Sequence, residues 1–134
     1  MRRLNCVTIN TDASFCADTG ASGFAFSIVC DVFCVKKAGS FKNPPKNAEE
    51  AEIMCIANAP HVLIDNMGEE ISCKLVVINT DCLNGVKKIE EKRKYKASIT
   101  ANKLAKIASI KLNAKVEFRH VKAHTANRSL RAYA

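Results

Sequence analysis

A repeated four-residue motif constrains the fold of this chain more than any other feature. The motif Ile-Asn-Thr-Asp at residues 9–12 recurs at residues 78–81, and each copy closes a short apolar run. Such β-branched runs are typical of buried strands. If the two strands lie side by side, Asp12 and Asp81 emerge at neighbouring positions of one sheet, where carboxylates repel each other unless a cation neutralises them. The alternative is that each aspartate only caps the turn after its strand.

Length and composition limit the kinds of protein that this chain can be. At 134 residues the chain is expected to form one domain with a buried core. No run reaches the roughly 18 apolar residues of a membrane span, and the N-terminus lacks the apolar core of a signal peptide, so we expect an intracellular, cytoplasmic protein with no membrane partner. The seven cysteines are odd in number and include no Cys-x-x-Cys pair. We interpret them as small buried residues, not as a disulfide framework or a zinc site.

The net charge of +8 is unevenly distributed along the chain. Residues 1–86 contain seven basic and ten acidic side chains, whereas residues 87–122 contain twelve basic and three acidic ones. An acidic half joined to a basic half is what a metal-dependent enzyme acting on a polyanion needs. The simpler interpretation is a solvated, lysine-rich helix.

The period of the apolar pattern predicts the order of the elements. Short apolar runs separated by turns indicate an antiparallel meander of three strands. These strands are expected at residues 4–11, 24–30 and 32–38, helices at 47–63, 81–92 and 97–112, and further strands at 74–80 and 114–121. Asn47 is expected to cap the first helix and Pro60 to kink or shorten it. A right-handed crossover then places the fourth strand beside the first.

Glu52 is the third acid that we assign to the site. It lies within the most regular helical pattern of the chain, between Ala51 and Ile53, and not on the opening turn of the helix. An acid on the inner flank of this helix can extend over the sheet edge toward the two aspartates. The alternative is a surface glutamate among three.

At this point the chain resembles the ribonuclease H (type 1-like) family. The matching motifs are a strand followed by Asp12-Ala-Ser14, a helix with Asn47-Ala-Glu-Glu-Ala-Glu52, a strand followed by Asp81, and Val121-Lys-Ala-His124. The resemblance implies an α/β ribonuclease H-like fold, a five-stranded mixed sheet of a three-strand antiparallel meander plus two parallel strands, flanked by helices. It also implies hydrolysis of the RNA strand of an RNA–DNA hybrid with two Mg²⁺ ions, for which Mn²⁺ can substitute.

The resemblance also implies roles for individual residues. Asp12, Glu52 and Asp81 match the metal ligands, and His124 matches a loop histidine that assists proton transfer or product release. Polar residues near Ser14 and Asn47 are expected to sense the 2′-hydroxyls of the hybrid. The resemblance also implies a basic substrate-binding region made of Lys87, Lys88, Lys92, Arg93, Lys94 and Lys96, together with Lys103 and Lys106.

The chain departs from the family pattern at its C-terminal end. The family has a further helix that opens with a fourth acid, but no Asp or Glu follows Glu117. We therefore expect residues 1–134 to be a single ribonuclease H-like domain that is C-terminally truncated relative to the family. Such a domain would have an impaired second metal site and an apolar surface that favours self-association.

Two other functions remain open at this stage. One is a DNA nuclease or junction resolvase of the same fold, which cleaves without reading 2′-hydroxyls. The other is a catalytically impaired module that binds hybrids without cutting them. Cleavage of one labelled strand in different duplexes distinguishes all three.

Overall fold

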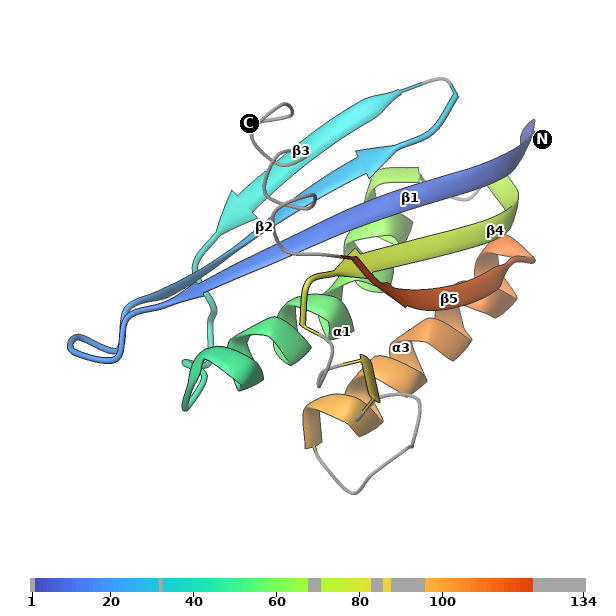
Figure 1. The fold of residues 1–134 in the computed structure, drawn as a ribbon. Coiled ribbons are helices and arrows are strands. Elements are labelled where there is room, and N and C mark those ends of the chain that lie inside the picture. The colour runs from blue at the N-terminus through green and yellow to red at the C-terminus, as the bar shows by residue number, and fades with distance from the viewer. Residues whose placement is uncertain (1, 32, 68–70, 83–85, 88–95, 122–134) are drawn as a thin grey trace.

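The computed structural model describes residues 2–31, 33–67, 71–82, 86–87 and 96–121, which form a mixed sheet with two helices on one of its faces (Figure 1). In chain order the elements are β1 (Arg2–Phe15), β2 (Ser22–Val29), β3 (Cys34–Gly39), α1 (Ala48–Met67), β4 (Ile71–Thr80), α3 (Lys96–Leu112) and β5 (Lys115–His120). Within the described part of the chain, no helix is both long enough and apolar enough to cross a membrane.

The five strands follow the order β3-β2-β1-β4-β5. β1, β2 and β3 form an antiparallel meander, whereas β1 pairs in parallel with β4, and β4 pairs in parallel with β5. The two copies of the repeated motif lie in register, with Ile9 opposite Ile78 and Asn10 opposite Asn79. The predicted fold, a three-strand meander extended by two parallel strands and flanked by helices, is therefore confirmed.

The central strand β1 separates an apolar face of the sheet from a polar one. Val7, Ile9 and Thr11 are buried on the face that the helices cover, whereas the intervening Asn10 and Asp12 are half-buried on the opposite face. A register slip of one residue would exchange these two sets. The apolar residues at the odd positions of β1 thus hold the carboxylate of Asp12 on the face away from the helices.

Helix α1 begins as predicted and ends later than predicted. The amide of Glu50 donates a hydrogen bond to Asn47 Oδ1 at 2.8 Å, which caps the first turn. Pro60 does not end the helix, which continues to Met67. Pro60 and Leu63 are both fully buried, so packing against the sheet and against α3 outweighs the hydrogen bond that proline cannot donate.

The other elements agree with the predicted order but differ in length. β1 continues beyond residue 11 to Phe15, because it remains paired with β2 after β4 has ended. The helix predicted over residues 81–92 falls mostly outside the described residues, although residues 86 and 87 are helical. The predictions of a missing C-terminal helix and a missing fourth acid concern residues 122–134, which also lie outside them.

Candidate active site

The candidate site lies at the carboxyl end of the central parallel pair, where β1 extends past β4. The ladder between the two strands runs to Asn10 opposite Asn79, and β4 ends directly afterwards. Asp12 therefore lies just past the end of the ladder, and Asp81 is the first residue after β4. The hydroxyl of Thr11 joins the strands at this point by donating to the carbonyl oxygen of Asn79 at 2.8 Å. Parallel pairing thus brings both predicted aspartates to the same end of the sheet.

The third acid reaches this end from the second turn of α1. Glu52 Oε1 accepts a hydrogen bond from the main-chain amide of Ala13 at 3.2 Å. A side chain can occupy this position because β1 no longer has β4 beside it. Glu52 therefore lies next to the residue that follows Asp12.

The three carboxylates influence one another electrostatically. Burial, reinforced by the negative charges of Asp81 and Asp12, raises the pKa of Glu52 to about 8. The pKa of Asp12 is also raised, first by burial and then by the charge of Asp81, although a hydrogen bond from the amide of Ala13 opposes the shift. Carboxyl groups whose pKa is raised by burial and by neighbouring acids are common where a protein binds a cation or moves a proton.

The chemistry of these acids fits a hard divalent cation, although the side chains are not gathered into a coordination shell. Glu52 Oε2 is buried and has no hydrogen-bond partner among the described residues, and a cation would satisfy this oxygen. Among the described residues, however, no three His, Cys, Asp or Glu side chains converge closely enough to hold a metal ion.

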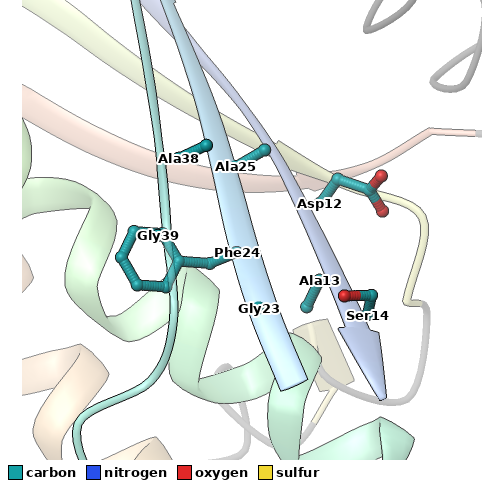
Figure 2. Close-up of a pocket in the computed structure, with 8 residues that line it drawn as sticks. All are labelled: Asp12, Ala13, Ser14, Gly23, Phe24, Ala25, Ala38 and Gly39. Carbon is teal, nitrogen blue, oxygen red and sulfur yellow. The ribbon is translucent and has the colours of Figure 1, made fainter. Parts of the chain in front are cut away.

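An open pocket of about 280 Å³ adjoins Asp12 on the face of the sheet away from the helices (Figure 2). Its lining residues come from the antiparallel meander and are mostly small. They are Asp12, Ala13, Ser14, Gly23, Phe24, Ala25, Ala38 and Gly39. The register explains the hollow, because Asp12 lies opposite Ala25, which lies opposite Ala38, and Ser14 lies opposite Gly23. No long side chain therefore stands beside the carboxylate on these strands.

The glycine at the end of β3 is required by a neighbouring aromatic ring. Phe24 lies directly opposite Gly39, and a Cβ atom at Gly39 would lie 2.9 Å from the Phe24 ring. The ring also packs against Phe26 and Phe41, with centroids 5.3 and 5.4 Å away. Figure 2 shows this ring and the Asp12 carboxylate projecting in opposite directions. Phe24 therefore fixes the meander from the helix side while the acid occupies the other side.

The structure places some of the predicted nucleic-acid-binding residues. Ser14 is exposed on β1 beside the pocket, and Asn47 is exposed at the start of α1, where its side chain caps the helix. Lys87 is exposed on the short helical stretch after β4, and Lys96 is the first residue of α3. The other predicted residues, Lys88, Lys92, Arg93, Lys94 and His124, lie outside the described part of the chain.

Sequence reasoning missed one buried contact that supports the site. Cys55 Sγ donates to the carbonyl oxygen of Asp12 at 3.3 Å, and burial together with the charge of Glu52 raises the pKa of this thiol. The contact fixes α1 against β1 beside the acid. A signal was present in the sequence, because Cys55 follows Glu52 by three residues and so lies on the same face of the helix.

Comparisons with known proteins identify the class to which this architecture belongs. The structure of RNase H1 from the halophilic archaeon Halobacterium salinarum NRC-1 matches with a TM-score of 0.71 at 13% identity, covering 92% of this chain and 91% of that one. LC11-RNase H1 in complex with an RNA/DNA hybrid matches with a TM-score of 0.71 at 16% identity, covering 91% and 89% of the two chains. These similarities show that the fold is that of RNase H.

A third structure agrees with these two. The N-terminal RNase H domain of rv2228c from Mycobacterium tuberculosis matches with a TM-score of 0.62 at 12% identity, covering 97% of this chain and 99% of that one. No curated protein sequence matches the chain significantly. The sequence model of the RNase H family matches residues 5–131. The chain therefore belongs to the RNase H family.

Proposed function

We propose that this protein is a metal-dependent endonuclease that hydrolyses the RNA strand of RNA–DNA hybrids. Membership of the RNase H family supports the proposal. One observation carries it, namely that Asp12, Glu52 and Asp81 share an electrostatic environment where β1 extends past β4. Burial and the neighbouring negative charges raise the pKa of Glu52 and of Asp12, so ionising both in the folded chain is unfavourable unless a cation completes the site.

The metal would be held by the carboxylate oxygens of Asp12, Glu52 and Asp81. Mg²⁺ prefers oxygen ligands and needs few protein carboxylates, because it keeps several of its waters, and Mn²⁺ accepts the same ligands. When bound, two such ions would activate the attacking water and stabilise the leaving 3′-oxygen. The buried Oε2 of Glu52 is the oxygen that most needs a partner.

The chain's own residues would prepare the site for the metal. Glu52, with its pKa near 8, is mostly protonated at neutral pH and must release this proton to act as a ligand. Its other oxygen is oriented by the amide of Ala13, and the carbonyl of Asp12 is fixed by the thiol of Cys55. These contacts orient the side chain of Glu52 and the backbone of Asp12 before metal binds. The carboxylates therefore need to move less to reach a common cation. His124 would assist proton transfer or product release.

Substrate binding would use the open face beside Asp12 and the basic part of the chain. The hollow lined by Gly23, Ala25 and Ala38 leaves room for a nucleic-acid strand next to the carboxylate. Ser14 and Asn47 would contact the minor groove, where 2′-hydroxyls distinguish a hybrid from duplex DNA. The lysines and arginine of residues 87–96 would bind phosphates, which gives affinity without sequence preference.

The test is cleavage of one labelled strand in three duplexes: an RNA–DNA hybrid, duplex DNA and duplex RNA, each with Mg²⁺ and with Mn²⁺. The proposal predicts cleavage of the RNA strand of the hybrid only, dependent on either metal. Cutting of duplex DNA would instead indicate a DNA nuclease or junction resolvase. Tight hybrid binding without cutting in either metal would indicate an impaired binding module.

A further inference from the structure

Helix α3 has an inward face made of small residues. Ala101, Ala108 and Leu112 are buried, and α3 packs mainly against α1, with only light contact to β4 and β5 (Figure 1). The alanines allow the two helix axes to approach closely. This face accounts for how α3 is held in the domain.

The opposite face of α3 exposes large apolar side chains. Ile99, Ile107 and Ile110 are 53%, 41% and 72% exposed. With 3.6 residues per turn, Ile99, Lys103, Lys106 and Ile110 fall on one narrow stripe, and Ile107 lies beside it. We call these five residues the Ile–Lys face. An exposed apolar stripe within a polar rim marks an interaction site more often than a scatter of single residues does.

The charge on this face is of one sign. Helix α3 contains no Asp or Glu, and Lys103 and Lys106 lie within the stripe while Lys111 is exposed near its C-terminal end. Within the described residues, none of these three lysines forms an ion pair. Their stems extend the apolar surface, and their ammonium groups can pair with carboxylates of a partner.

The combination of side chains selects the partner. A second copy of this chain, related by two-fold symmetry, would bring the same lysines together, which is unfavourable. Nucleic acid would use the lysines but has no need of three exposed isoleucines. A helix with an apolar stripe flanked by carboxylates satisfies both the isoleucines and the lysines.

We propose that the Ile–Lys face docks an acidic amphipathic helix of another protein. The partner helix would place apolar residues at i, i+3 or i+4, and i+7 against Ile99, Ile107 and Ile110, and its Asp or Glu side chains beside Lys103 and Lys106. This site lies on α3, in the helix layer (Figure 1), whereas the alternation along β1 places Asp12 on the other face of the sheet. The docking site therefore does not include the three carboxylates of the candidate active site.

The test uses a fluorescently labelled 20-residue peptide with Leu at these spacings and Glu on its flanks. Titration of the peptide with the full chain, followed by fluorescence anisotropy, should show saturable binding that weakens with salt. A control peptide in which Lys replaces Glu should not bind. The double variants I99Q/I110Q and K103E/K106E should each weaken binding at least tenfold. All four substitutions lie on exposed positions, and equal melting temperatures would confirm that the fold is intact.

A matched control changes the same charge elsewhere. K42E/K46E replaces two exposed lysines of the loop before α1 and should leave peptide binding within twofold of wild type. The proposal is overturned if the acidic peptide does not bind, if the basic peptide binds equally, or if K42E/K46E weakens binding as much as K103E/K106E. It is also overturned if the isoleucine variant loses hybrid affinity and the hybrid displaces the peptide, because the face would then bind nucleic acid.

Discussion

Neutralising Glu52 should stabilise the metal-free protein in a pH-dependent manner. Burial and the charges of Asp81 and Asp12 raise the pKa of Glu52 from 4.5 to about 8 in the folded state. A raised pKa means that the folded protein binds the proton more tightly than the unfolded chain does. The wild-type fold therefore loses stability as the pH rises from about 4.5 to about 8, and the loss is complete above that value.

The size of the stability loss follows from the change in the pKa of Glu52 on folding, reduced because solvent screens part of the charge. Each pKa unit corresponds to about 1.4 kcal/mol, and the carboxyl group is only partly shielded from water, so we expect about 2 kcal/mol between the two limits. Glu52→Gln removes the ionisation but keeps an oxygen that can accept the hydrogen bond from Ala13. The variant should therefore unfold with a free energy about 2 kcal/mol above wild type at about pH 8.5, and near the wild-type value at about pH 4.5.

Thermal unfolding followed by circular dichroism in EDTA measures this difference. For a domain of this size, about 2 kcal/mol corresponds to a rise of roughly 6 °C in Tm. Glu49→Gln is the matched control, because it makes the same change in the first turn of α1, where a negative charge favours the helix dipole. The control should lower Tm slightly. A Glu52→Gln variant that is no more stable than wild type at the higher pH, or equally stabilised at both pH values, would refute the reasoning.

Three further predictions concern the metal, the basic segment and the pocket. Isothermal titration of wild type with Mg²⁺ should show affinity that rises between about pH 6 and pH 8 with proton release, because Glu52 must deprotonate, and pH-independent affinity would contradict this. Replacing the four basic residues of segment 92–96 with Ser should reduce the slope of log hybrid affinity against log salt concentration, by up to about 0.9 for each phosphate that the variant no longer binds. An unchanged slope would show that this segment is only a solvated surface. Gly39→Ala should displace the Phe24 ring and lower the free energy of unfolding by about 1 kcal/mol, measured by urea denaturation, whereas an unchanged midpoint would show that the ring yields freely.

The sequence predicts the sheet well because its signals are local and repeated. The Ile-Asn-Thr-Asp motif lies within β1 and recurs at the end of β4, and parallel pairing places its copies in register, with Ile9 opposite Ile78. Alternating burial along β1 follows directly from its pattern of apolar residues. The length of α1 could not be predicted in this way, because Pro60 is tolerated only when the tertiary packing of that helix outweighs its cost.

The sequence nominates candidate residues for the site but does not reveal their environment. The repeated motif, the helical pattern and the family resemblance together nominate Asp12, Glu52 and Asp81, yet the sequence does not reveal that β1 extends past β4 and leaves the amide of Ala13 to Glu52. The hollow beside Asp12 depends on the pairing of β1, β2 and β3, since Gly23 and Ala38 are distant along the chain. Burial and pairing decide these features, and both are properties of the folded chain.

The most direct test of the central claim is cleavage of the labelled RNA strand of a hybrid by wild type and by Asp12→Asn in Mg²⁺, with hybrid affinity measured separately without metal. The account predicts that wild type cleaves and that the variant loses more than the roughly 100-fold expected for a residue outside the metal's own ligands. Hybrid affinity and Tm in EDTA should not fall, because the substitution removes a repelling charge from the site. Cleavage by Asp12→Asn at the wild-type rate would contradict the assignment of the three carboxylates as the active site.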